Sequence, residues 1–108
     1  MSLADAKKSL LIRFIRETDL EEWHKQVWIE TIENSIAKLK DVLRRFKNGE
    51  FRTPRDLDDA SEEAQALWRG RCIIAVEVCG TTPKMWKLFE KVYHAIQEIE
   101  HEDFRELI

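Results

Sequence analysis

The chain has 108 residues, 18 basic and 21 acidic side chains, and a formal net charge of −3. This length fits one domain, and the mixed charge argues against nucleic-acid binding through bulk positive charge. Charged residues make up 36% of the sequence, above a usual share of about 25%, whereas glycine and proline are scarce. We therefore expect a helix-rich protein with few turns and a surface of interspersed ion pairs.

The first expected helix covers residues 3–16, where Leu3, Leu10, Leu11, Phe14 and Ile15 give a broad apolar face. A second expected helix covers residues 19–48, because Thr18-x-x-Glu21 has the pattern of a capping box. Its apolar positions alternate in steps of four and three, like one seam of a coiled coil. That row is Trp28, Ile32, Ser35, Leu39, Val42 and Phe46.

Residues 49–57 read as a link, in which Thr53-Pro54 can open a short helical turn. A third helix is expected over residues 58–80 and a fourth over residues 83–106, the latter opened by Thr82-Pro83. The β-branched run 72–78 resembles a strand, but the patterns on both sides of it are helical. The sequence predicts an all-α fold, a four- to five-helix antiparallel bundle in one domain over residues 1–108.

The two cysteines, Cys72 and Cys79, are seven positions apart on one expected helix. Two helical turns separate them by about 10 Å, too far for a disulfide bond. We expect buried free thiols in a reducing compartment. No secretory signal or membrane-spanning run is recognised, so a cytoplasmic protein without membrane contact is predicted.

Three side chains do not fit a minimal monomeric bundle. Ile73 and Val76 are predicted to point away from the apolar face of the helix over 58–80, and Trp23 away from the seam of the preceding helix. A helix that is apolar all round is either a central fifth element or an interface. Arg71 is also predicted on the apolar face of the helix over 58–80. If it is buried, its guanidinium requires an anionic partner such as Glu21; otherwise its side chain extends to solvent at the edge of the helix.

Two Glu-x-x-His motifs raise the question of a di-metal site, since helical bundles use this spacing for carboxylate-bridged metals. They are Glu21–His24 and Glu98–His101. On a helical wheel, Glu98 and His101 point about 140–180° away from the apolar side of their helix, whereas metal ligands must project inward. We therefore predict no metal site within one chain and leave open a site between subunits.

A second candidate metal site comes from Glu30-x-x-Glu33 and the later pair Glu62 and Glu63. This arrangement resembles the carboxylate pairs of the all-α nucleotide pyrophosphohydrolases of the MazG type. The resemblance covers the middle third of the chain and implies Mg²⁺ held against a phosphate chain by carboxylates of two adjacent helices. The second pair departs from the pattern, because Gln65 follows Glu62 at the expected spacing.

The stretch 38–55 is locally basic and is a candidate surface for nucleic acid or another polyanion. Its basic residues are Lys38, Lys40, Arg44, Arg45, Lys47, Arg52 and Arg55. No base-reading motif accompanies them, and cations near a helix C-terminus also complement the helix dipole. We favour this structural interpretation over nucleic-acid binding.

No nucleophile–base pair and no glycine-rich phosphate loop is recognised, so the sequence favours a non-enzymatic role and implies no cofactor. We expect a protein that works by association, as a homo-oligomer or with a protein partner, through Ile73, Val76 and Trp23. A divergent Mg²⁺-dependent pyrophosphohydrolase and a polyanion-binding protein remain as alternatives.

Overall fold

The computed structural model describes the backbone of residues 3–105 and the side chains of residues 4–102. It contains four helices, α1 (Leu3–Arg16), α2 (Glu22–Lys47), α3 (Pro54–Cys79) and α4 (Pro83–Arg105), and no strand within these residues. The predicted all-α fold is confirmed, with four helices and no fifth. The run 72–78 is helical, as expected from its neighbours. Residue 106, the predicted end of the last helix, lies outside the described residues.

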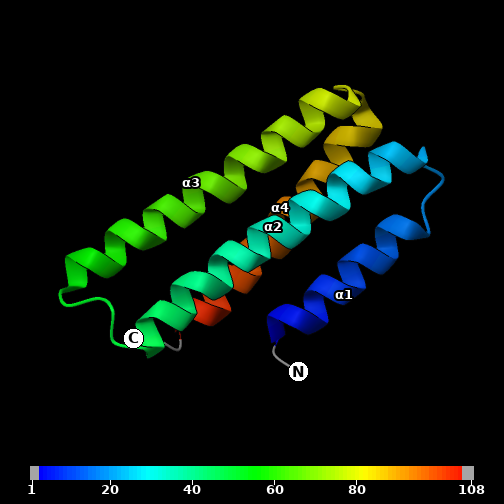
Figure 1. Cartoon of the computed structure of the whole chain (residues 1–108). Coiled ribbons are helices and arrows are strands. Elements are labelled where there is room, and N and C mark those ends of the chain that lie inside the picture. Colours follow the sequence, from blue (N-terminus) through cyan, green and yellow to red (C-terminus); the bar gives the residue numbers. More distant parts are fainter. Residues whose placement is uncertain (1–2, 106–108) are drawn as a thin grey trace.

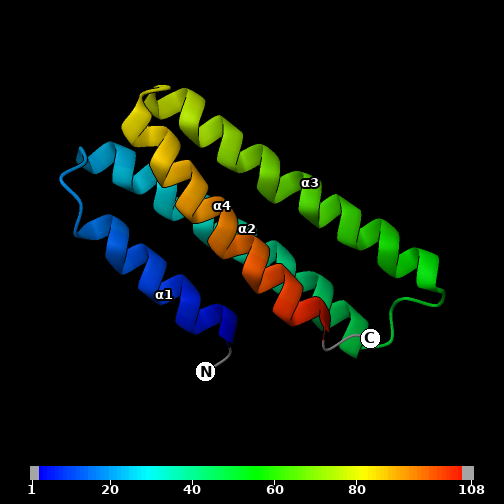
Figure 2. The ribbon, with the colours of Figure 1, turned by 180° about the vertical axis from the view of Figure 1, so that it is seen from behind.

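The helices form an up-and-down bundle in which α2 and α4 lie between α1 and α3 (Figures 1 and 2). Helix α2 packs against each of the other three, and α4 also packs against α1 and α3. Across the described residues, α1 and α3 do not contact each other. The two edge helices therefore each keep a broad face that no other part of the described chain covers.

The apolar seam of α2 forms the centre of the core. Trp28, Ile32, Leu39 and Val42 are at most 1% exposed, in agreement with the predicted row. Ser35 is also fully buried, and its hydroxyl donates to the carbonyl of Thr31 over 2.6 Å, so this polar group is satisfied inside the helix. Helix α4 contributes a matching buried row, namely Met85, Leu88, Val92, Ile96 and Ile99.

Helix α3 begins four residues before the predicted start at residue 58. Thr53 caps it: its hydroxyl accepts the backbone N–H of Asp56 over 3.2 Å, and the Asp56 carboxylate accepts the Thr53 N–H over 3.2 Å. Pro54, at the first helical position, has the fixed φ that this position favours. The reciprocal cap places the helix start at Pro54, ahead of the aspartates at 58 and 59.

The predicted capping box at Thr18 and Glu21 does not form, and α2 begins at Glu22 without a side-chain cap. The Thr18 hydroxyl instead donates to the carbonyl of Ile15 over 2.6 Å, which satisfies the last turn of α1. Thr82 does cap α4 as predicted, since its hydroxyl accepts the Met85 N–H over 3.3 Å.

Both cysteines are buried free thiols, as predicted. Burial raises the pKa of the Cys72 thiol to about 12 and also raises the pKa of Cys79. Both side chains therefore behave as small apolar groups of the core.

A buried carboxylate between α3 and α4 was not predicted from the sequence. Glu100 is 9% exposed and accepts the indole N–H of Trp68 over 2.7 Å and the amide of Gln65 over 2.8 Å. Trp68 is itself fully buried, so Glu100 supplies the acceptor that its indole needs. This network fixes the position of α4 along α3.

We expect Glu100→Ala to lower the free energy of unfolding by about 1–3 kcal/mol, because the buried indole N–H loses its acceptor. Glu98→Ala is the matched control, since Glu98 is exposed and pairs with Lys7 at the surface; its effect should stay within about 0.5 kcal/mol. Urea titration followed by circular dichroism measures both. Equal stability of the Glu100→Ala and wild-type proteins would contradict the structural role of the network.

In a Cys79→Ser protein at pH 8, we expect Cys72 to react with a disulfide reagent about a thousandfold more slowly than in the urea-unfolded chain. The reason is that its pKa of about 12 is about three units above the ordinary value of about 9, so far less of the reactive thiolate is present. The neutral buried thiol contributes stability that is complete below about pH 9 and is lost as the pH rises towards 12. Rapid reaction of the folded variant would contradict burial of this thiol.

Candidate association surfaces

Two adjoining hollows follow the seam between α1 and α4. The first, of about 350 Å³, lies next to the α1–α2 turn, and the second, of about 390 Å³, lies further along the same seam. Phe14 and Lys91 line both, so the two hollows adjoin, and we call the pair the α1/α4 groove. Its apolar lining includes Leu10, Phe14, Leu20 and Leu88.

The α1/α4 groove combines exposed apolar side chains with a cationic rim. Leu10 is 66% exposed and Phe14 is 41% exposed, although both belong to the apolar face of α1. The ammonium of Lys91 lies 4.3 Å from the centroid of the Phe14 ring, in a cation–π contact. Lys87 lines the groove without an anionic partner among the described residues. The groove therefore combines an apolar lining with the positively charged side chains of Lys87 and Lys91.

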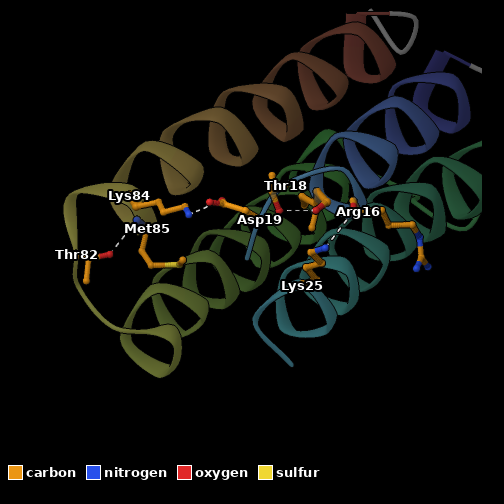
Figure 3. A network of polar contacts seen from close by, with 8 residues as sticks. Arg16, Thr18, Asp19, Lys25, Thr82, Lys84 and Met85 are labelled. Carbon is orange, nitrogen blue, oxygen red and sulfur yellow. Dashed lines mark hydrogen bonds and ion pairs between the residues drawn. The ribbon is translucent and has the colours of Figure 1, made fainter. Parts of the chain in front are cut away.

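An ion pair ties together the two turns at one end of the bundle (Figure 3). Lys84, in the first turn of α4, donates to the carboxylate of Asp19 in the α1–α2 turn. This hydrogen bond lowers the pKa of Asp19 below its usual value. Nearby, the Lys25 ammonium donates to the carbonyl of Arg16 over 3.1 Å, closing the end of α1. Asp19 and Lys84 also line the first hollow, so their ion pair connects its two sides.

Helix α3 presents a second apolar surface near its C-terminus. Ile73 is 48% exposed, as predicted, but Val76 is 1% exposed and lies in the core. The predicted outward orientation of Val76 was wrong, because the angle of a residue on a helical wheel does not fix the direction from which other helices pack on α3. The other exposed apolar side chains of this part of α3 are those of Ile74, at 57%, and Val78, at 52%.

The outward side of α3 also carries a run of acidic residues. We define the outer face of α3 by the residues that share this side from Asp59 to Glu77. They are Asp59, Glu62, Glu63, Ala66, Gly70, Ile73, Ile74 and Glu77. At 100° per residue, the exposed Arg71 lies about 120° round the helix from Glu77 and so falls outside this face. The outer face thus combines four acidic residues with two isoleucines and no basic residue.

Arg71 was predicted on the apolar face, either with an anionic partner such as Glu21 or extending to solvent at the edge, and the second alternative is confirmed. Its side chain is exposed, at the edge of α3. The partly buried guanidinium on this helix belongs to Arg69, which lies 5.5 Å from the Trp68 ring centroid and 5.9 Å from that of Tyr93. An aromatic row on α4, Trp86–Phe89–Tyr93, continues from this contact, and Trp86 at its end is 46% exposed.

Trp23 is 51% exposed, and its indole donates to the Glu21 carboxylate over 2.7 Å. The ion pair of Lys38 with Glu63 sets the register of α2 against antiparallel α3. Trp23 lies fifteen residues before Lys38 on α2, and Val78 lies fifteen residues after Glu63 on α3. Both are therefore displaced towards the same end of the bundle. These two exposed side chains therefore lie at the same height on neighbouring helices.

The two Glu-x-x-His motifs lie at opposite ends of the bundle, because α2 and α4 run parallel, and Glu21 and His24 lie at the start of α2 whereas Glu98 and His101 lie near the end of α4 (Figure 1). His24 is 4.0 Å from Glu21, and Glu98 pairs with Lys7 over 3.1 Å. Among the described residues, no three His, Cys, Asp or Glu side chains gather in a way that could hold a metal ion. The structure does not bring the two motifs together.

The carboxylates of the pyrophosphohydrolase hypothesis are all exposed. Glu30 accepts a hydrogen bond from Gln26 over 3.0 Å on its own helix, and Glu33 is also at the surface of α2. Glu63 lies 3.9 Å from Lys38, whereas Glu62 points to solvent on α3. These glutamates do not converge on a common inward site.

Most basic residues of the stretch 38–55 have acidic neighbours. Lys38 faces Glu63, Lys40 pairs with Asp5, Arg44 pairs with Asp41 and Glu50, Arg45 faces Glu50, and Arg55 faces Asp59. Arg45 also lies over the Phe51 ring at 4.9 Å. The side chains of Lys47 and Arg52 are exposed. Much of the local positive charge is thus balanced within the chain, so this stretch presents no uniformly positive surface.

No helix within the described residues has the length and apolar character needed to cross a membrane. Comparison of the chain with protein-family models, curated proteins and solved structures gave no match. The surfaces described above therefore carry the functional argument on their own.

Proposed function

We propose that this protein acts by self-association, and that its apolar contact lies near the C-terminal end of α3. The observation that carries the proposal is the exposure of Ile73, Ile74 and Val78, which are each about half exposed on one helix. Trp23 extends the same region onto α2. Contiguous exposed apolar groups of this size are typical of surfaces that another molecule covers.

Gly70 supports the same surface. A glycine inside a helix costs about 1 kcal/mol relative to alanine, so its presence asks for a packing reason. A Cβ at Gly70 would meet no other heavy atom within 4 Å, so nothing within the chain requires the missing side chain. Gly70 lies one turn before Ile73 and Ile74, where the absence of a side chain lets a partner approach the backbone of α3.

The energetic argument for association is direct. Full burial of an isoleucine or valine side chain contributes on the order of 1.5–3 kcal/mol, so covering the exposed half of each of these side chains contributes about half of that. Three such side chains and a tryptophan, which is a frequent anchor of interfaces, can support an association in the micromolar range once the cost of ordering two molecules is subtracted. A second function is not proposed, because no contact in the structure favours the metal-dependent or polyanion-binding hypotheses over this one.

We expect the wild-type protein to be an oligomer and the double variant Ile73→Lys, Ile74→Lys to be a folded monomer, because charged side chains cannot be covered at an apolar contact. Light scattering behind a sizing column gives the mass, and circular dichroism gives the helix content. Val76→Lys is the matched control on the same helix: Val76 is buried, so this change should unfold the protein. A monomeric wild-type protein at about 100 µM would contradict self-association.

A further inference from the structure

We infer that the outer face of α3 of one copy binds in the α1/α4 groove of the next copy, so that the chain associates head to tail. This inference rests on the proposed self-association and names the second surface of the contact. In a head-to-tail contact the two sides differ, whereas a two-fold dimer would bring α3 against α3. The choice between them follows from the charges of the two surfaces.

The charges of the outer face and of the groove are complementary. The outer face carries Asp59, Glu62, Glu63 and Glu77. Asp59 lies 4.0 Å from Arg55 and Glu63 lies 3.9 Å from Lys38, whereas Glu62 and Glu77 have no basic partner among the described residues. Four lysines line the groove, Lys7, Lys84, Lys87 and Lys91, against two acids, Asp19 and Glu98, which already pair with Lys84 and Lys7. Two lysines thus remain for an incoming anionic surface, whereas contact between two outer faces would bring acidic residues of the same sign together.

The apolar parts are complementary as well. The groove offers Leu10 and Phe14, which are both exposed, and the outer face offers Ile73 and Ile74 next to Gly70. A helix laid in a groove between two helices is a common mode of recognition, in which side chains at helical spacing enter the hollows. The two hollows of about 350 and 390 Å³ give room for isoleucine side chains.

The positions along the two surfaces also determine a direction. On the outer face, Glu62 precedes Ile73 by 11 residues, or about 16 Å of helix. In the groove, Lys87 precedes Ala95 by eight residues, or about 12 Å of helix. Ala95 and Leu10 both line the second hollow. The two lengths agree to within about one helical turn when the acidic half of α3 faces Lys87 and Lys91 and the isoleucines face Leu10. The bound α3 then runs parallel to α4 of the copy that receives it.

The two surfaces lie on different sides of the bundle. Helix α1, which forms one wall of the groove, and α3 are at the two far edges, with α2 and α4 between them (Figure 2). One copy can therefore receive a neighbour in its groove while its own α3 binds in another copy. Such an assembly is an open chain or a closed ring, and not a dimer with one shared patch.

The test mixes two variants that each lack one surface. The groove variant is Lys87→Glu, Lys91→Glu, and the face variant is Ile73→Lys, Ile74→Lys; all four positions are exposed, so both proteins should fold. Each alone should be a monomer. An equimolar mixture should form a complex of two chains, because the intact outer face of the groove variant binds the intact groove of the face variant. Light scattering and circular dichroism measure mass and helix content.

The outcomes separate the inference from the proposed function. A monomeric wild-type protein would contradict the proposed function itself. An oligomeric groove variant would preserve self-association but overturn the role of the groove, and two monomeric variants that form no mixed complex would overturn the pairing of these two surfaces.

A charge reversal on both surfaces checks the same contact within one chain. Adding Asp59→Lys and Glu62→Lys to the groove variant should restore association, since both positions belong to the half of α3 that faces residues 87 and 91 and the signs are again complementary. Glu90→Lys is the control, because Glu90 is an exposed residue of α4 that does not line the groove, and it should leave the mass of the oligomer unchanged. Failure of the fourfold variant to associate, with its helix content intact, would count against the electrostatic pairing.

Discussion

The structure depends on the burial of one seam of α2. Trp28, Ile32, Leu39 and Val42 are fully or almost fully buried because α1, α3 and α4 all pack on this helix. Among the described residues, the indole N–H of Trp28 has no hydrogen-bond partner, and the ring is packed by apolar neighbours of the core. With one helix at the centre and α4 beside it, two helices must take the edges. Their outer faces then meet the solvent, and both candidate surfaces arise from this arrangement.

The sequence was sufficient to predict the fold class and the main core. The seam of α2 was recognised because its apolar residues alternate at the spacing that a helix requires, and this row is buried except for Phe46, which is partly exposed. The helical state of residues 72–78 was recognised from the neighbours, since β-branched residues alone do not separate strand from helix. Thr82 was recognised as a cap because it precedes a proline that opens a helix.

Other features could not be predicted because they depend on how helices face one another. Val76 was expected to point outward and lies in the core, since a helical wheel gives the angle between residues but not the direction of the neighbouring helix. The burial of Glu100 required a tryptophan donor 32 positions away in the sequence. The α1/α4 groove likewise brings together Phe14 and Lys91, and nothing in either local pattern indicates this contact.

The short length of α1 has a consequence for the groove that it borders. This helix has 14 residues, and an isolated helix of this length is only marginally stable in water. Its order therefore comes from docking on α2 and α4, and local unfolding of α1 would remove one wall of the groove while leaving the packing of α3 on α2 and α4 in place. Any molecule that occupies the groove would be thermodynamically linked to this docking, so amide hydrogen exchange in α1 would slow on binding.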